Sequence, residues 1–368
     1  MRIALFLGSL GMGGAEAVAV SLANEFRARG CHVNVVLARE SGPFAERLGT
    51  GICVHPLQCK HVRQAVAPLI TYLQETKPDV LLSSLTNCNI VALRARKRVD
   101  YNLRVAVSEH IVDSEHRTNA VTTAKRVMMR YLAKRAYRDA DHVIAVSSGV
   151  ADDVGGAFDV ERHRIEVIHN PFELDEIQSL SEAHVEHPWL GSTEIPVILA
   201  AGRLTRQKSF GTLLRAFSIV RRAVNARLII LGEGADREEL EALRDELELS
   251  DVVDLPGFDP NPYAYMAKAS QFVLSSAWEG FGNVLVEAMA CGCPVVSTNC
   301  RSGPSEILAN GRYGLLVPVG DPDALAQAMK STLRAPVSSR KLRDRAADFS
   351  SDRIAAQYLS VLCKGMEM

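Results

Sequence analysis

The chain has 368 residues, with 42 Lys or Arg against 43 Asp or Glu, a length that suits two domains of ordinary size. A net charge of −1 excludes a protein whose bulk charge draws it onto nucleic acid or an anionic membrane. With 47% hydrophobic and 23% charged residues, the chain is neither disordered nor collagen-like nor a coiled coil. The opening MRIALFLG predicts a first strand and not a signal peptide, and no apolar run approaches the length of a membrane-spanning helix.

In chain order, short runs rich in β-branched residues alternate with amphipathic segments, which predicts an α/β protein with parallel sheets. In the first half we expect strands at residues 2–7, 32–37, 52–55, 80–83, 103–108, 142–146 and 165–168. In the second half we expect them at residues 197–201, 227–231, 252–255, 271–275, 294–298 and 314–317. Amphipathic helices are expected between them, for example at residues 15–29, 209–223, 236–247 and 281–290.

The strand pattern breaks at about residues 169–196, where Pro, His and Glu replace it. We therefore expect two Rossmann-like, doubly wound domains that face each other across a cleft, at residues 1–170 and 171–350. The last helix, within residues 351–368, has no strand left to pair with, and we expect it to pack back on the first domain.

A glycine-rich turn, GSLGMGGAE, follows the first expected strand. Its Gly13 and Gly14 would let backbone N–H groups approach an anion at a helix start. The dinucleotide-binding spacing G-x-G-x-x-G is absent, and the second strand ends near Arg39 without the acidic residue that would bind a ribose. NAD binding is therefore disfavoured.

The loop GRLTRQKS follows the first strand of the second domain. It places Arg203 and Lys208 at the carboxyl edge of a parallel sheet, just before a helix, which is where such sheets bind ligands. An arginine fork and a lysine point charge suit the diphosphate of a nucleotide.

Two glutamates stand eight residues apart in EGFGNVLVEAMACGCPVV. Glu279 lies in the loop after an expected strand, and Glu287 lies about two turns into the following helix. Glu287 falls among apolar residues, so its carboxylate needs a partner. Residues 280–282, Gly-Phe-Gly, would expose backbone N–H groups at the helix start.

These segments resemble the retaining glycosyltransferases of family 4, which have the GT-B fold. The resemblance rests on the E-x7-E pattern of Glu279 and Glu287, on GRLTRQKS, on the GGAE turn, on the SEH triplet at 108–110 and on SGPSEIL at 302–308. It covers nearly the whole chain. The motifs are specific to the family but not to one sugar.

The resemblance implies a role for each matching position. Arg203 and Lys208 would hold the donor diphosphate, Glu279 the donor sugar and Glu287 the ribose hydroxyls, while His110 would contact the sugar or the attacked centre. The donor-binding residues so implied are Gly13, Gly14, Arg203, Lys208, Gly257, Phe258, Glu279, Phe281, Gly282, Asn283, Val284 and Glu287. The implied catalytic residues are His110, Arg203, Lys208 and Glu279.

The same parts suggest front-face transfer, in which the leaving diphosphate helps to deprotonate the acceptor hydroxyl while fixed cations stabilise its charge. We expect no cofactor and no required metal, because the D-x-D sequence Asp139–Asp141 should lie at a helix–strand junction away from the cleft. A non-hydrolysing nucleotide-sugar epimerase and a sugar-nucleotide sensor without turnover remain alternatives. Both could share the donor-binding residues.

The acceptor is less well defined by the sequence. Residues 94–138 contain 12 Lys or Arg and 4 Asp or Glu, and Arg126, Arg130 and Lys134 share one helical stripe near Met128 and Tyr131. Such a helix can lie on an anionic membrane, although composition alone favours a solvated helix face. Similar enzymes extend polyprenyl-diphosphate-linked sugars, so we expect a cytoplasmic enzyme, peripheral on the inner face of the membrane, with UDP-hexose or UDP-N-acetylhexosamine as donor.

Overall fold

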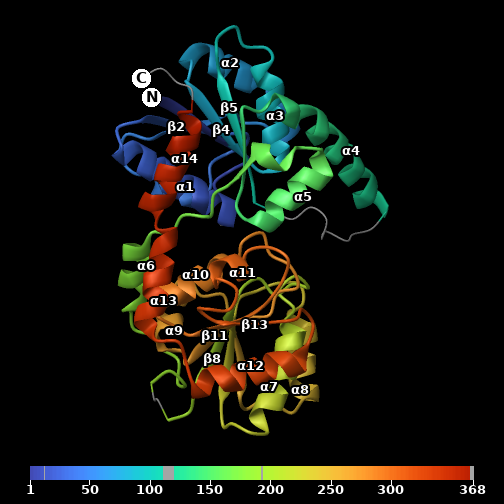
Figure 1. Cartoon of the computed structure of the whole chain (residues 1–368), viewed down its shortest axis with the longest axis vertical. Coiled ribbons are helices and arrows are strands. Elements are labelled where there is room, and N and C mark those ends of the chain that lie inside the picture. Colours follow the sequence, from blue (N-terminus) through green and yellow to red (C-terminus); the bar gives the residue numbers. More distant parts are fainter. Residues whose placement is uncertain (12, 111–119, 192–193, 365–368) are drawn as a thin grey trace. The chain divides into compact units, whose positions relative to one another are not determined.

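The computed structural model describes residues 1–11, 13–110, 120–191 and 194–364, and in helix α4 it describes side chains from residue 127 onward. The chain divides into two compact units (Figure 1). Unit 1 comprises Met1–Phe172 and Ser351–Met368, and unit 2 comprises Glu173–Ser350. Each unit is described by itself below.

Unit 1 contains a parallel sheet that, within the described residues, has seven strands in the order β3-β2-β1-β4-β5-β6-β7. Its strands are β1 (Arg2–Leu7), β2 (His32–Leu37), β3 (Cys53–Pro56), β4 (Val80–Ser84), β5 (Arg104–Glu109), β6 (His142–Ala145) and β7 (Ile165–Val167). Its helices are α1 (Gly14–Ala28), α2 (Val66–Thr76), α3 (Thr86–Arg96), α4 (Ala120–Ala136), α5 (Ser148–Phe158) and α14 (Ser351–Leu362).

Two groups of helices cover the two faces of this sheet (Figure 1). Helices α1 and α14 pack on one face, where Phe26 and Tyr358 are fully buried against the strands. Helices α2, α3, α4 and α5 follow one another in contact on the other face. Because both faces are covered, the strands are apolar almost throughout, as in the RIALFL sequence of β1. The expected return of the C-terminal helix to the first domain is thus observed.

Unit 2 contains a second parallel sheet, with the order β10-β9-β8-β11-β12-β13 in the described part of the chain. Its strands are β8 (Val197–Ala201), β9 (Arg227–Leu231), β10 (Val253–Gly257), β11 (Gln271–Leu274), β12 (Val295–Thr298) and β13 (Leu315–Val317). Its helices are α6 (Leu174–Ser181), α7 (Phe210–Arg221), α8 (Arg237–Glu246), α9 (Pro262–Lys268), α10 (Asn283–Ala290), α11 (Pro304–Ile307), α12 (Pro322–Arg334) and α13 (Ser339–Ala346).

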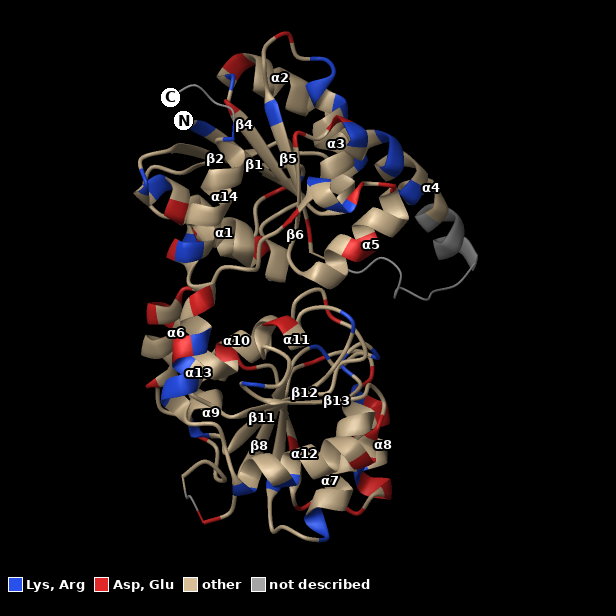
Figure 2. Ribbon diagram, viewed as in Figure 1, with Lys and Arg blue, Asp and Glu red and all other residues tan. Residues whose placement is uncertain are grey.

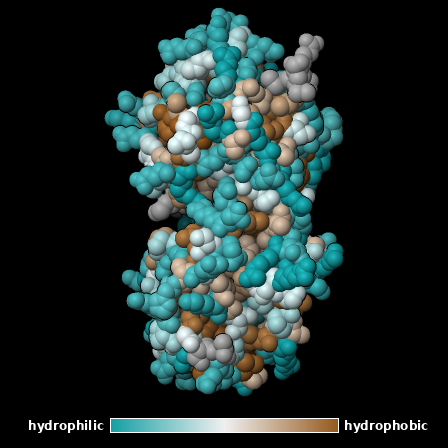
Figure 3. Space-filling view, turned by 90° about the vertical axis from the view of Figure 1, so that its left-hand side faces the viewer, coloured by the Kyte–Doolittle hydropathy of each residue, from teal (hydrophilic) through white to brown (hydrophobic). Residues whose placement is uncertain are grey.

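Every strand expected from the sequence is present, with ends that differ by at most two residues. Each unit encloses its own hydrophobic core. The face shown in Figure 3 is mainly hydrophilic, with hydrophobic residues in small separate patches. Among the helices that the structure describes, none combines the length and the hydropathy needed to cross a bilayer.

Candidate active site

The strand order of unit 2 reverses between β8 and β11, which lie side by side. In an open parallel sheet, the loops that leave the carboxyl ends of two such strands diverge to opposite faces and leave a crevice that binds ligands. The loop after β8 carries Arg203 and Lys208, and the loop after β11 carries Glu279. The topology therefore brings together the two segments that the sequence singled out.

Lys208 and Glu279 form an ion pair at this edge, with 2.6 Å between Nζ and Oε1. Their side chains are only 13% and 9% exposed, so the pair is largely removed from water. Removing either partner would leave an unpaired charge in a poorly solvated place, which is far more costly than losing a surface ion pair. In this state of the protein, each side chain is therefore the ionic partner of the other.

A shell of hydroxyl and backbone groups holds this pair. Ser276 Oγ donates to Glu279 Oε1 at 2.6 Å, and Thr298 Oγ1 donates to the carbonyl of Ser276 at 2.6 Å. On the other side, Ser275 Oγ donates to the carbonyl of Lys208 at 2.8 Å. Gln207 Nε2 donates to the carbonyl of Trp278 at 3.0 Å, so the loops after β8 and β11 are directly joined.

Glu287 lies on α10, and burial raises the pKa of its carboxyl to about 7, while the charge of Lys208 acts in the opposite direction. The sequence predicted that this carboxylate needs a partner. The charge of Lys208 acts on the carboxyl of Glu287, but the ammonium group of Lys208 forms its ion pair with Glu279. A ligand hydroxyl that donates to Glu287 would supply the missing partner.

The start of α10 depends on two glycines. Gly282 precedes the helix with a φ of +100°, and Gly303 has a φ of +91°. A Cβ atom on Gly303 would overlap the carbonyl of Phe281, so the two loops can cross only because residue 303 has no side chain. This crossing fixes the backbone of residues 281–283, to which the resemblance assigned donor binding.

The remaining predicted donor residues of unit 2 differ in how exposed they are. Arg203 is exposed, Asn283 and Val284 open α10 with partly buried side chains, and Phe258 is 64% exposed just after β10. Gly257 ends β10 with a φ of +100°. A largely exposed phenyl ring at the end of a strand is available for stacking on a flat ligand.

In unit 1, His110 directly follows β5 and is half-buried. Its Nε2 lies 3.1 Å from Ser108 Oγ, and its buried Nδ1 has no hydrogen-bond partner among the described residues. Burial lowers the pKa of His110 to about 4, so its imidazole is neutral at physiological pH. Ser108 Oγ also lies 3.4 Å from the hydroxyl of Tyr358, so α14 contributes to the surroundings of this histidine.

The carboxylate next to His110 belongs to a buried hydrogen-bond network. Glu109 accepts hydrogen bonds from the hydroxyl of Tyr137, from Asn89 Nδ2 at 3.0 Å and from Thr86 Oγ1 at 3.1 Å. Asn89 also donates to the carbonyl of Ser108 at 3.0 Å. The network attaches α3 to the end of β5 and so fixes the backbone that carries His110.

Gly13 and Gly14 stand at the start of α1, Gly13 as the N-cap residue and Gly14 as the first helical residue. The carboxylate of Glu16 folds back against Gly13, where a Cβ would meet the end of this flexible side chain. In this structure a carboxylate of the protein thus already lies at the helix start that the sequence assigned to an incoming phosphate.

The predicted membrane patch lies on α4, which carries several of the basic residues of unit 1 (Figure 2). The side chain of Arg126 lies outside the described residues. Lys134 forms an ion pair with Asp159, with 3.1 Å between Nζ and Oδ2, and Arg130 is partly buried. Lys134 is therefore already neutralised within the protein.

The D-x-D sequence Asp139–Asp141 lies at a helix–strand junction, between α4 and β6, as predicted. Asp139 pairs with Lys97, and Asp141 pairs with Arg96 and accepts from the backbone N–H of Val105 at 2.7 Å. These contacts occupy both carboxylates of the D-x-D sequence at the amino edge of the sheet. No cluster of three or more potential metal-ligating side chains occurs among the described residues.

Solved structures show the same two-sheet fold. The chain superposes on Anabaena HepE in complex with UDP-glucose with a TM-score of 0.80 at 22% identity, covering 99% of this chain and 100% of that one. The apo form of the lipopolysaccharide outer core galactosyltransferase WaaB gives 0.78 at 21% identity, with all of both chains covered. At this identity the likeness concerns the fold alone, and it defines an α/β protein of the GT-B fold.

Family models and curated relatives define the family. The model "Glycosyltransferase Family 4" matches residues 12–176, and "Glycosyl transferases group 1" matches residues 188–349. One relative, from Campylobacter jejuni, is 29% identical over 98% of this chain and 99% of its own. It is the N-acetylgalactosamine-N,N'-diacetylbacillosaminyl-diphospho-undecaprenol 4-alpha-N-acetylgalactosaminyltransferase. The lipopolysaccharide 1,6-galactosyltransferase of Escherichia coli is 27% identical over 72% of this chain and 67% of its own.

The chain belongs to the group 1, family 4 glycosyltransferases, and it is a hexosyltransferase-type enzyme. The resemblance stated from the sequence is thereby confirmed. Its reaction is the transfer of a glycosyl group from a nucleotide-sugar to a glycan acceptor.

Sequence reasoning missed several residues of the site. Ser276 and Thr298 support Glu279, and Gly303 allows the loop crossing, but serine, threonine and glycine in loops carry no distinctive pattern. Tyr358 could not be linked to His110 from the sequence because 248 positions separate them. The positive φ required at Gly303 could have been suspected from the Gly-Pro pair that opens α11.

Proposed function

We propose that this enzyme transfers a hexose or N-acetylhexosamine from UDP to a hydroxyl of a polyprenyl-diphosphate-linked glycan, with retention of configuration and without a metal. The observation that carries the proposal is the buried Lys208–Glu279 pair, which lies where the strand order of unit 2 reverses. The charge of the same lysine also lowers the pKa of Glu287, against the effect of burial. The Campylobacter jejuni relative, whose name includes a diphospho-undecaprenol acceptor, supports the choice of acceptor.

In this proposal, an incoming diphosphate replaces Glu279 as the ionic partner of Lys208. Arg203, which is exposed, would bind the diphosphate as a fork, and Lys208 would turn from Glu279 to a phosphate oxygen. Glu279 would then be free to accept hydrogen bonds from hydroxyls of the donor sugar, with Ser276 still holding it in place. Glu287 would accept from the ribose hydroxyls.

The transfer itself breaks the bond between C1 of the sugar and the leaving phosphate oxygen, and it forms a bond from the acceptor oxygen to C1 on the same face. The proton of the acceptor hydroxyl passes to the leaving diphosphate. Arg203 and Lys208 stabilise the charge that grows on this diphosphate. His110, being neutral at physiological pH, would serve as a hydrogen-bonding group for the sugar and not as a cation.

The proposed acceptor places the enzyme on the cytoplasmic face of a membrane. The basic stripe of α4, comprising Arg126, Arg130 and Lys134, would contact anionic lipid headgroups. Charge reversal of all three residues to Glu should release the protein from vesicles containing phosphatidylglycerol. Unchanged binding would contradict the membrane assignment.

Nucleotide release from a panel of UDP-, GDP- and ADP-sugars tests the proposed reaction, with EDTA present and with a crude lipid-linked glycan fraction added or omitted. The proposal predicts release of UDP alone, at a rate that increases with the lipid fraction and persists in EDTA. The anomeric configuration of the product, read by NMR, should match that of the donor. Loss of release in EDTA, or an inverted product, would contradict the mechanism.

A further inference from the structure

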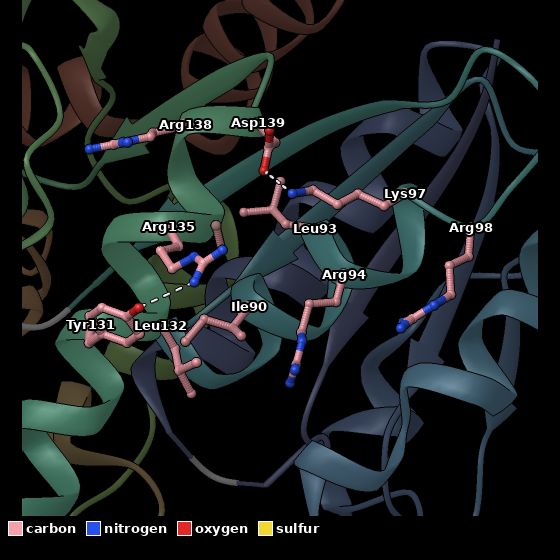
Figure 4. Close-up of a pocket in the computed structure, with 11 residues that line it drawn as sticks. Ile90, Leu93, Arg94, Lys97, Arg98, Tyr131, Leu132, Arg135, Arg138 and Asp139 are labelled. Atoms are coloured by element: carbon pink, nitrogen blue, oxygen red, sulfur yellow. Dashed lines mark hydrogen bonds and ion pairs between the residues drawn. The ribbon is translucent and has the colours of Figure 1, made fainter.

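Unit 1 contains a cavity of about 650 Å³ that the proposed donor site does not use (Figure 4). It lies between α3 and α4 and is open to solvent on one side. Its lining residues are Ile90, Leu93, Arg94, Lys97, Arg98, Tyr131, Leu132, Arg135, Ala136, Arg138 and Asp139. We call this cavity the α3–α4 groove. None of the residues assigned to the donor or to the predicted membrane patch lines it.

The groove is strongly cationic, and only part of its charge is neutralised. Lys97 pairs with Asp139, with 2.7 Å between Nζ and Oδ2, and Arg138 pairs with Asp159 outside the groove at 3.5 Å. The other three cations, all exposed, have no carboxylate partner among the described residues; they are Arg94, Arg98 and Arg135. The groove therefore carries three guanidinium groups whose charge no carboxylate of the described residues balances.

All three guanidinium groups belong to side chains that line the same groove. Arg94 and Arg98 lie one turn apart on α3 and just beyond it, and Figure 4 shows both side chains extending in the same general direction. Arg135 projects from α4, held at the groove by a hydrogen bond to the hydroxyl of Tyr131 at 3.2 Å and by contact with its ring. Arginine forks of this kind match the geometry of phosphate oxygens.

The groove also has an apolar side. Ile90 and Leu93 from α3 and Leu132 from α4 form its floor, and Ile90 and Leu132 face each other between the helices in Figure 4. Beside it, α4 exposes the large hydrophobic side chains of Val127 (61% exposed) and Met128 (58%). Exposed apolar groups of this size next to several cations that line one groove are complementary to a ligand in which an anion is joined to a hydrocarbon.

We propose that the α3–α4 groove binds the diphosphate of a prenyl-diphosphate-linked acceptor, with the first prenyl units against its apolar side. Three unbalanced guanidinium groups match the two negative charges of a diphosphate diester better than the single charge of a phospholipid phosphodiester. This inference rests on the proposed function, since it assigns a place to one part of the proposed acceptor.

The position of the groove fits an extended acceptor. Helix α3 begins at Thr86, next to the carboxyl edge of the sheet that carries His110, and it reaches Arg94 eight residues later. At 1.5 Å per residue, this corresponds to roughly 12 Å along the helix. The lipid anchor and the reacting hydroxyl would thus contact different parts of unit 1, with the intervening sugars between them.

Farnesyl diphosphate, titrated calorimetrically into the full-length protein saturated with UDP, tests the groove directly. UDP occupies the donor site, so that this site cannot bind the probe. We expect farnesyl diphosphate to bind at least tenfold more tightly than farnesyl monophosphate or inorganic pyrophosphate. The triple variant Arg94→Glu/Arg98→Glu/Arg135→Glu should lose at least tenfold in affinity.

A matched variant controls for net charge. Arg215→Glu/Arg222→Glu/Lys268→Glu makes the same charge change at exposed positions of unit 2, and it should bind farnesyl diphosphate like the natural protein. Unchanged affinity in the groove variant would overturn the proposal. So would a groove variant that loses only its binding to phosphatidylglycerol vesicles, because the groove would then serve the membrane surface.

Kinetics separate this inference from the proposed function. With a lipid-linked acceptor, the groove variant should show a KM for the acceptor raised at least tenfold, while kcat and the affinity for UDP change less than twofold. With a soluble glycoside that lacks the diphosphate, it should match the natural protein. If the natural protein glycosylates no acceptor, the proposed function fails, but the farnesyl diphosphate titration still decides the groove.

Discussion

At the scale of single residues, the site of unit 2 is governed by the scarcity of solvent around its charges. Lys208 and Glu279 form an ion pair with each other. Burial raises the pKa of the Glu287 carboxyl to about 7. In the proposed function, an incoming diphosphate would replace Glu279 as the partner of Lys208, and a ribose hydroxyl would supply a partner for Glu287.

A double-mutant cycle should reveal the Lys208–Glu279 pair. Lys208→Met and Glu279→Gln should each lower the free energy of unfolding by about 3 kcal/mol, because each leaves the other group buried without its partner. The double variant should lose at least about 1 kcal/mol less than the sum of the two. Additive losses, measured by denaturant unfolding, would show that the pair is not coupled.

The raised pKa of Glu287 predicts a pH-dependent stability. A carboxyl whose folded pKa lies above its unfolded value stabilises the fold at pH values below the unfolded pKa, and this stabilisation is lost as the pH rises through about 7. Without nucleotide, Glu287→Gln should therefore resemble the natural protein near pH 4.5 and exceed its free energy of unfolding by up to about 3 kcal/mol at pH 8.

The control for this pH experiment is Glu246→Gln, at an exposed position near the end of α8. It should follow the pH profile of the natural protein. A difference between Glu287→Gln and the natural protein that stays constant from pH 4.5 to 8 would mean that Glu287 does not titrate in this range.

At the scale of elements, the site depends on where loops leave the sheet and how closely they cross. The crossing of residue 303 over the carbonyl of Phe281 sets the backbone at the start of α10. Gly303→Ala should therefore lower the free energy of unfolding by more than about 2 kcal/mol and weaken UDP binding at least tenfold, because the loop of residues 279–283 must move.

Gly156→Ala provides the matched comparison. Gly156 lies inside α5, and a Cβ there meets no atom within 4 Å. The same substitution should raise the stability by about 0.5–1 kcal/mol and leave UDP binding unchanged. Equal effects of the two substitutions on UDP binding would contradict the role given to the crossing.

The elements themselves were largely predictable from the sequence. Strands buried on both faces, such as β1 and β8, are continuous apolar runs. Arg203 and Lys208 follow β8, Glu279 follows β11 and His110 follows β5, as the strand pattern predicted. The internal pairing of Lys208 with Glu279 was not predictable, because the sequence assigned both side chains to a ligand. The α3–α4 groove was also not predictable from the sequence, because it is formed by two helices packed side by side and not by a motif.

At the scale of the whole molecule, each unit has its own core, and the C-terminal helix belongs to the first. Tyr358→Ala in α14 removes a fully buried ring and should cost about 3–5 kcal/mol in unit 1. Both tryptophans, Trp189 and Trp278, lie in unit 2. The part of the circular dichroism transition that reports unit 1 should therefore move to lower denaturant concentration. The tryptophan fluorescence transition, which reports unit 2, should stay in place.

The milder variant Tyr358→Phe removes only the hydroxyl near Ser108. It should cost about 1 kcal/mol. If Tyr358→Ala shifts the fluorescence transition as far as the circular dichroism transition, the two units unfold as one cooperative body.

The most direct test of the central claim, that this glycosyltransferase moves sugar from UDP to a lipid-linked glycan, is the initial rate of UDP release against acceptor concentration. We predict a rate that increases with acceptor and saturates, accompanied by an equal amount of glycosylated lipid. A rate that is independent of acceptor, or UDP-sugar that is bound and never consumed, would contradict the account and favour an epimerase or a sensor.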